Sequence, residues 1–161
     1  MENGFSQAEY QRRIAGIRDR IQEKDLDGAL VFDPYNVFYL GLYYHPGKRP
    51  VMLYIHRDGT VLAVTPAMEA HEARKVKHFA TVDAYEDNYA AGSDLYDCLK
   101  DTVTAAVGSV SKVAVDQVGL AAYRRLGEIF SDLTVEDVVF PSRIIKSREE
   151  VEMLKTSATY S

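Results

Sequence analysis

The stretch LDGALVFDPYNVFYLGLYYHPGKRPVMLYI, residues 26–55, decides the fold of this 161-residue chain. Its apolar run GALVFD (28–33) lacks polar alternation, which is typical of a strand buried on both faces of a sheet. Further along, PVMLYIH (50–56) and TVLAVT (60–65) flank RDGT, whose Asp-Gly pair predicts a β-hairpin. This hairpin makes one strand pair antiparallel, so the sheet is expected to be mixed.

A first helix is predicted before this stretch. Ser6 and Glu9 form a capping box, which is a common start of a helix. Apolar residues then recur at steps of three and four over residues 7–24. The charged residues between them, including Arg12 and Arg13, are expected on the solvent side.

The rest of the chain alternates between helical and strand-like patterns. Asn36 is expected to cap a short helix that ends at Gly41. Further helices are predicted at 66–77, 94–107 and 120–130, and further strands at 79–85, 112–116 and, as an edge strand, 133–138. Together these elements predict a three-layer α/β/α fold with a mixed, mostly parallel sheet of five or six strands. Its expected core contains Ile14, Ile17, Ile21, Leu30, Val31, Leu53, Val64, Val113 and Val115.

The composition is that of an ordinary globular protein, with 47% hydrophobic and 27% charged residues. A chain of this length can form one domain without a disulfide or a metal. The formal net charge of −5 disfavours nucleic acid and anionic membranes as partners, because both need a basic surface. The single cysteine, Cys98, lies beside Leu95, Leu99 and Val103, which recur at helical spacing, and is expected to be a packed thiol.

The sequence also predicts a compartment. Its first residues do not resemble a signal peptide, and no stretch approaches the ~20 apolar residues of a membrane span. One cysteine without a partner fits a reducing environment. We therefore expect a cytoplasmic protein.

Three aspartates raise the question of a metal site. Asp33, Asp83 and Asp116 each lie at or near the carboxyl end of a predicted strand, where they could converge on Mg²⁺ for phosphodiester cleavage. Acids at such positions commonly form turns and helix caps instead. The acidic net charge favours this second interpretation, since it disfavours a nucleic-acid substrate.

The histidines do not have the spacing of a metal site. His71 and His78 are seven residues apart and lack an H-E-x-x-H pattern, so they are expected on a solvated helix face. His56 stands at the end of a predicted strand, and we expect it to be exposed.

The chain ends with SRIIKSREEVEMLKTSATYS, residues 142–161. Ser147 and Glu150 form a second capping box, and Val151, Leu154 and Ala158 then follow at helical spacing. The pattern predicts a new amphipathic helix whose apolar stripe needs a partner.

Two phrases of the sequence resemble one family. Residues 26–55 look like a segment of the N-terminal domain of metallopeptidases of the creatinase, prolidase and aminopeptidase P group, with a strand, a turn, an Asn, an aromatic-rich phrase and an Arg-Pro pair. SRIIKSREEVEMLK (142–155) resembles the phrase that closes that domain. The resemblance implies a ribonuclease H-like topology for residues 1–146. It implies that residues 147–161 begin the linker helix into a C-terminal pita-bread catalytic domain.

The resemblance also implies a function. The chain would be the non-catalytic N-terminal domain of an Xaa-Pro peptidase (prolidase or aminopeptidase P) or a creatinase-like hydrolase, shaping the substrate pocket and the dimer interface. In this family the metal ligands lie in the C-terminal domain and hold two divalent ions, commonly manganese, cobalt, zinc or iron. No cofactor, metal ligand or catalytic residue is therefore expected in this chain. The expected partners are its own C-terminal domain, a second copy in a homodimer, and a proline-containing peptide or small carboxylate substrate.

The segment YYHPGKRP (43–50) carries the candidate substrate-binding residues. Its Gly and two Pro predict a loop that presents Tyr43, Tyr44, His45 and Arg49. The planar guanidinium of Arg49 suits a carboxylate, and in creatinase-like members an Arg just before Pro binds the substrate carboxylate in the neighbouring subunit's active site. The alternative is a solvated Arg on a rim above packed tyrosines.

Two other functions stay open at this stage. Some relatives keep the fold, lose the metals and bind peptides or proteins, so a metal-free binding module is the main alternative. A nuclease that uses the three aspartates is the other. The sequence does not separate prolidase, aminopeptidase P and creatinase, because that choice lies mostly in the other domain.

Overall fold

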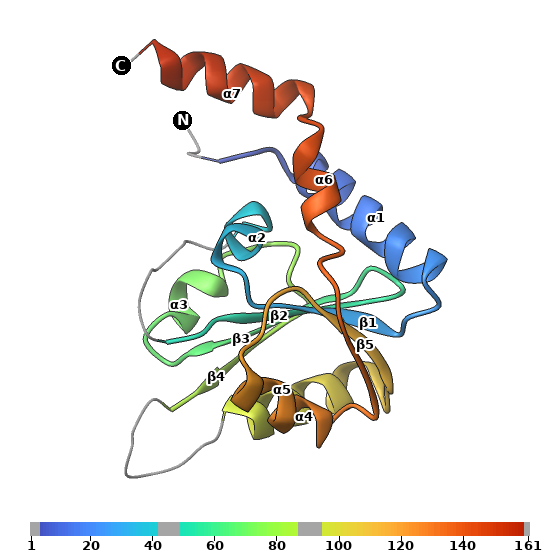
Figure 1. Cartoon of the computed structure of the whole chain (residues 1–161). Helices are drawn as coiled ribbons and strands as arrows, with labels where there is room; N and C mark the ends of the chain where they lie inside the picture. Colours follow the sequence, from blue (N-terminus) through green and yellow to red (C-terminus); the bar gives the residue numbers. More distant parts are fainter. Residues whose placement is uncertain (1–3, 42–48, 87–94, 160–161) are drawn as a thin grey trace.

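The computed structural model describes residues 4–41, 49–86 and 95–159, which are built around one six-stranded sheet (Figure 1). The strands are β1 (Gly28–Val31), β2 (Met52–His56), β3 (Val61–Pro66), β4 (Thr81–Tyr85), β5 (Lys112–Val115) and β6 (Asp132–Val135). The helices are α1 (Gln7–Glu23), α2 (Pro34–Tyr39), α3 (Ala70–Ala73), α4 (Leu95–Val107), α5 (Leu120–Gly127), α6 (Phe140–Ile144) and α7 (Arg148–Ala158).

The strands lie in the order β4-β3-β2-β1-β5-β6. The pairs β1–β5, β5–β6 and β3–β4 are parallel, whereas β1–β2 and β2–β3 are antiparallel. The mixed, mostly parallel sheet and the edge position of β6 are thus confirmed. The expectation of a single antiparallel pair was wrong, because β2 returns directly beside β1 instead of crossing over the sheet.

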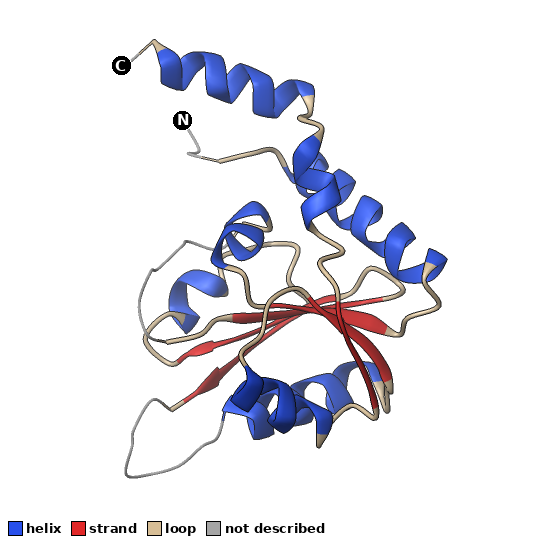
Figure 2. Cartoon of the chain, in the orientation of Figure 1, coloured by secondary structure: helices blue, strands red, loops and turns tan. Residues whose placement is uncertain are grey.

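Helices cover both faces of the sheet (Figure 2). On one face α4 and α5 pack through Leu99 and Leu126 against a cluster that includes Leu30 and Val64. On the other face α1 packs against a cluster of its own, which also takes in residues of α2 and α3. Successive residues of β1 point to opposite layers, so the strand is apolar throughout, as its sequence predicts. All nine predicted core residues are buried.

The hairpin between β2 and β3 forms where the Asp-Gly pair predicts it. Gly59 has a φ of +95°, a backbone conformation that an L-residue adopts only with strain. The side chain of Asp58 accepts a hydrogen bond from the backbone N–H of Thr60 and so closes the turn.

Several helix boundaries differ from the prediction. Asn36 does not cap α2: the side chain of Asp33 accepts from the N–H groups of Tyr35 and Asn36, and Pro34 occupies the first turn. The helix α3 is only four residues long, whereas a helix over 66–77 was predicted. It does not begin at Pro66, because Pro66 is the last residue of β3 and pairs with Tyr85.

The C-terminal elements also differ. The helix α5 ends at Gly127, and Phe130 turns back into the core. The strand β6 ends before Asp137, whose carboxylate accepts from the N–H groups of Val139 and Phe140 and so starts α6, a helix that the sequence analysis missed.

In the residues that the structure describes, no helix combines the length and the apolar character needed to cross a membrane.

Candidate functional site

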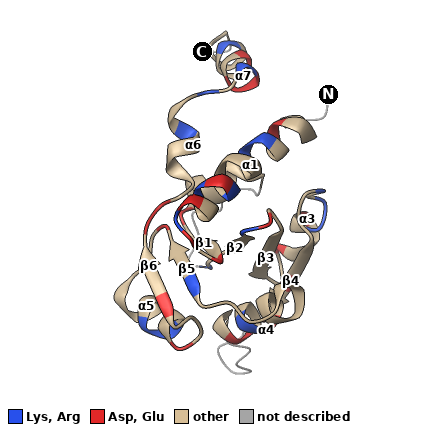
Figure 3. Ribbon diagram, turned by 90° about the vertical axis from the view of Figure 1, so that its right-hand side faces the viewer, with Lys and Arg blue, Asp and Glu red and all other residues tan. Residues whose placement is uncertain are grey.

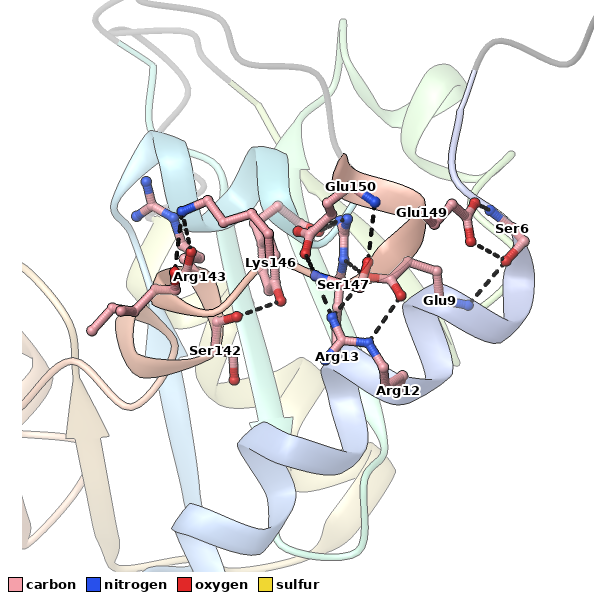
Figure 4. Close-up of polar contacts among 12 residues, drawn as sticks. Ser6, Glu9, Arg12, Arg13, Ser142, Arg143, Lys146, Ser147, Glu149 and Glu150 are labelled. Carbon is pink, nitrogen blue, oxygen red and sulfur yellow. Dashed lines mark hydrogen bonds and ion pairs between the residues drawn. The ribbon is translucent and has the colours of Figure 1, made fainter. Parts of the chain in front are cut away.

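The first turns of α1 and α7 meet through a group of charged side chains, which we call the α1–α7 clamp: Ser6, Glu9, Arg12, Arg13, Glu149 and Glu150 (Figure 4). Ser147 caps α7, and the carboxylate of Glu150 accepts in return from the N–H of Ser147 at 2.7 Å. Both predicted capping boxes therefore lie at helix starts, and the structure brings these two starts together. Figure 3 shows that α1 and α7 carry charged residues of both signs.

Arg13 is the centre of this clamp, with a side chain that is only 1% exposed. Its Nε donates to Glu9 Oε1 at 2.9 Å and its Nη2 donates to Glu150 Oε1 at 3.1 Å, while Nη1 donates to the carbonyl of Tyr39. The guanidinium carbon also lies 4.0 Å from the ring centre of Phe5 and 4.2 Å from that of Tyr39. A buried arginine is tolerated only with such partners.

The expectation that Arg13 faces solvent was therefore wrong. The signal was present in the sequence, because Arg13 stands three residues after Tyr10 and four before Ile17, within the apolar stripe. Its neighbour Arg12 does lie at the surface, 47% exposed, and forms a two-point contact with Glu9. Hydrogen bonding to Arg12, with further help from Arg13, lowers the pKa of Glu9 to about 2.

A second polar network holds the carboxyl ends of β1 and β5. Asn36 is fully buried; its Nδ2 donates to Asp116 at 2.8 Å and to Asp137 at 3.0 Å, and its Oδ1 accepts from Arg143 at 2.8 Å. Asp116 also accepts from the backbone N–H groups of Phe32, Asp33 and Gln117. Burial raises the pKa of Asp116.

The three aspartates do not form a metal site. Asp33 caps α2, as the favoured interpretation predicts, and Asp116 lies near it and accepts from its backbone N–H. Asp83 lies near the carboxyl end of β4, as predicted, but it accepts a hydrogen bond from Thr102 of α4 at 2.7 Å. Within residues 4–41, 49–86 and 95–159, no three His, Cys, Asp or Glu side chains are grouped so as to hold a metal ion.

The histidines occupy three different environments. His71 is exposed on α3, as predicted. His78 is not on a solvated helix face: its Nε2 lies 2.7 Å from the carbonyl oxygen of Leu40, and its ring stacks on Tyr10 with 4.6 Å between ring centres. Burial lowers the pKa of His78. The side chain of His56 is 18% exposed, so it is more buried than expected.

Of the four candidate substrate-binding residues, the structure describes Arg49. It lies at the surface just before β2, and its Nη1 contacts the sulfur of Met68. The next residue, Pro50, is held by a hydrogen bond from the Tyr85 hydroxyl to its carbonyl at 2.8 Å. Tyr43, Tyr44 and His45 lie outside the described residues.

Large apolar side chains are exposed near the end of the chain. No residue of α7 is buried, and Val151, Met153 and Leu154 are 37%, 45% and 58% exposed. Large apolar side chains are also exposed on α2 and α6 and directly after α6: Tyr35, Phe38, Phe140, Ile144 and Ile145. Cys98, in contrast, is partly buried against the core, and burial raises the pKa of its thiol. Such exposed apolar surfaces are typical of regions that contact another domain or protein.

The α/β fold is similar to that of solved proline dipeptidases and Xaa-Pro dipeptidases. The structure of a proline dipeptidase from Streptococcus pneumoniae matches with a TM-score of 0.70 and 25% identity, over 83% of this chain and 98% of that one. An Xaa-Pro dipeptidase from Bacillus anthracis matches with a TM-score of 0.74 and 16% identity, over 91% of this chain and 39% of that one.

Sequence comparison agrees with the structural match. YkvY of Bacillus subtilis (strain 168), which is named as a dipeptidase, is 25% identical over 152 residues, or 91% of this chain. The chain spans 41% of the length of that relative. The model of the creatinase/prolidase N-terminal domain matches residues 13–144. The chain therefore belongs to the creatinase/prolidase N-terminal domain family, as its two phrases indicated.

Proposed function

We propose that this chain is the non-catalytic N-terminal domain of a cytoplasmic Xaa-Pro dipeptidase or aminopeptidase P-like enzyme. In that setting it shapes the substrate pocket and contributes to the interface of a homodimer. A C-terminal domain of the same protein holds two divalent metal ions, which activate water and polarise the scissile carbonyl. The substrate is a peptide with proline after its first residue.

One observation carries this proposal. The family match covers residues 13–144, and the likeness to the Bacillus anthracis Xaa-Pro dipeptidase covers 91% of this chain but 39% of that enzyme. The exposed apolar side chains on α7, α2 and α6 support a domain that works against another one.

Arg49 is the residue that we assign to the substrate in this proposal, with Tyr43, Tyr44 and His45 beside it. Arg49 is exposed, and its neighbour Pro50 is held to β4 through Tyr85. A guanidinium on an anchored backbone can offer two parallel N–H groups to a carboxylate. Two parallel charged donors on Arg49 would bind the terminal carboxylate of a short substrate more strongly than an uncharged peptide group.

A metal-free binding module is the second candidate. The exposed aromatic side chains Tyr35, Phe38 and Phe140 favour it, because large exposed aromatic groups are common at protein–protein contacts. Such a module would use the same fold but would not need an intact metal centre in a second domain.

The test is hydrolysis of an Xaa-Pro dipeptide by the full-length gene product, measured with and without Mn²⁺ after chelation. The proposal predicts turnover that is lost on chelation and restored by metal, with no turnover by the 161-residue chain alone. Absence of turnover under any divalent metal would favour the binding module. Turnover by the 161-residue chain alone would overturn the non-catalytic assignment.

A further inference from the structure

The helix α7 is held to the domain at its beginning. Its apolar residues Val151, Met153 and Leu154 are exposed, so packing of an apolar face does not hold it. In the described part of the chain, Glu149 and Glu150 make the side-chain hydrogen bonds that join α7 to α1 (Figure 4). Both residues lie in the first turn, so the direction of the whole helix depends on this turn.

Glu150 connects the start of α7 to Arg13 with one carboxylate. Its Oε2 accepts from the backbone N–H of Ser147 at 2.7 Å, and its Oε1 accepts from Arg13 at 3.1 Å. The two oxygens have a fixed separation and orientation, so the N-cap of α7 and the guanidinium of Arg13 are held in one relative position.

Arg13 is itself held from several sides. Glu9 and the Tyr39 carbonyl accept its other N–H groups, and the rings of Phe5 and Tyr39 lie against its guanidinium. The group that receives Glu150 is therefore part of the packed domain and not a free surface arginine, which would contribute little.

Glu149 provides a second point of attachment. Its two oxygens accept from the backbone N–H and the hydroxyl of Ser6, at 2.8 Å for the hydroxyl. The same hydroxyl caps α1 by accepting from the N–H of Glu9. Two neighbouring residues of α7 thus bind two different groups of α1, which restricts rotation of α7 as well as its translation.

We propose that the α1–α7 clamp sets the direction in which α7 leaves the domain, with Arg13 as the positioning residue that receives Glu150. Without Glu150, Arg13 keeps Glu9 and the Tyr39 carbonyl, so the domain stays folded while α7 loses its fixed direction. Where the proposed function holds, this direction positions the catalytic domain relative to Arg49, the residue that we assign to the substrate.

The test is a distance measurement on the 161-residue chain. Spin labels are placed at Lys100 on α4 and Ser157 on α7, both exposed, in a Cys98→Ser background. The matched variants are Glu149→Gln/Glu150→Gln and the control Glu152→Gln. Glu152 pairs with Lys155 within the same helix at 3.0 Å. Glutamine at position 150 keeps a capping-box side chain but offers one oxygen where the carboxylate uses two.

A narrow distance distribution is expected for the starting chain and for Glu152→Gln, and a distribution at least twice as broad for the double variant. Circular dichroism should report the same helical content in all three. An equally narrow distribution in the double variant would overturn the proposal. Loss of helical signal would overturn it too, because the two glutamates would then act as helix formers and not as attachments.

A second measurement links the clamp to the proposed function. In the full-length protein, Glu149→Gln/Glu150→Gln should lower kcat/KM for an Xaa-Pro dipeptide by roughly ten- to a hundredfold, because misplacement by about 1 Å is enough to slow catalysis. Glu152→Gln should leave kcat/KM unchanged. An inactive unmodified protein would refute the proposed function alone, since the distance measurement on the 161-residue chain is independent of activity.

Discussion

Arg13 on α1 and Glu150 on α7 are 137 residues apart in the sequence and form an ion pair with 3.1 Å between Nη2 and Oε1. The arginine side chain is 1% exposed and the glutamate side chain 12% exposed, so water screens this pair much less than it screens a surface pair. The pair joins the first and last helices that the structure describes.

Arg13→Met should lower the free energy of unfolding by about 3 kcal/mol, since it leaves Glu9 and Glu150 with one partner fewer in a buried setting. The matched control is Arg12→Met, which removes the exposed partner of the same two glutamates and should cost less than Arg13→Met, because the Arg12 side chain is 47% exposed. Urea denaturation of both variants measures the difference. Equal losses would mean that the burial of Arg13 adds nothing to its contribution.

The stability of the chain should depend on Glu9 at acid pH. The pKa of this group falls from 4.5 to about 2 on folding, so the unfolded chain binds the proton more readily and stability falls as the pH drops. The contribution is complete above pH 4.5 and is lost between pH 4.5 and pH 2; a shift of this size corresponds to about 3 kcal/mol.

Thermal unfolding between pH 2 and pH 6 tests this dependence on Glu9. Glu9→Gln should flatten the curve in that range, because glutamine does not titrate. A variant whose curve parallels that of the unmodified chain would show that other carboxylates govern acid unfolding.

Gly41→Ala should destabilise the chain by about 2 kcal/mol. Gly41 has a φ of +98°, and an added Cβ would lie 3.1 Å from the ring of His78 and 3.2 Å from that of Tyr10. The control is Gly127→Ala at the end of α5, where an added Cβ meets nothing within 4 Å and should stabilise the chain by up to about 1 kcal/mol. Chemical denaturation should therefore move the two midpoints in opposite directions; a shift in the same direction would contradict the prediction.

Arg49→Ala in the full-length protein should lower kcat/KM roughly ten- to a hundredfold without changing the melting temperature, because a charge-assisted hydrogen bond to substrate is worth about 1.5–3 kcal/mol. Arg49→Lys should restore part of the activity, since an ammonium group cannot offer two parallel donors. The loss should disappear with a substrate whose carboxylate is amidated. Equal losses on the free and amidated substrates would leave Arg49 as a surface residue without a role in binding.

Much of the fold follows from short-range patterns. The apolar run at 28–33 and the Asp-Gly turn at 58–59 predict the central strand and the hairpin, because burial on both faces and a tight turn each leave a local signature. Both capping boxes, at Ser6 and at Ser147, predict real helix starts for the same reason.

The polar contacts were harder to predict. Asn36 was expected to cap α2, but Asp33 does so. The side chain of Asn36 instead donates to Asp116 and Asp137, which are 80 and 101 residues away in the sequence. His78 was expected in solvent, but it stacks on Tyr10 of α1, which is distant in the sequence. The assignment of Tyr43, Tyr44 and His45 to substrate binding stays a prediction. The domain boundary between residues 146 and 147 also stays a prediction.

The sequence by itself determined the α/β class, the strands and the starts of the first and last helices, because these depend on periodicity, turn residues and caps within a few positions. The family followed from the resemblance of two of its phrases to known members. Only the tertiary structure decided that Arg13 is buried, that Asn36 donates hydrogen bonds to Asp116 and Asp137, and that α7 is held by α1. Each of these depends on groups brought together from distant parts of the chain. The sequence around a charged or polar residue does not reveal which distant group will form the hydrogen bond or ion pair that compensates its burial.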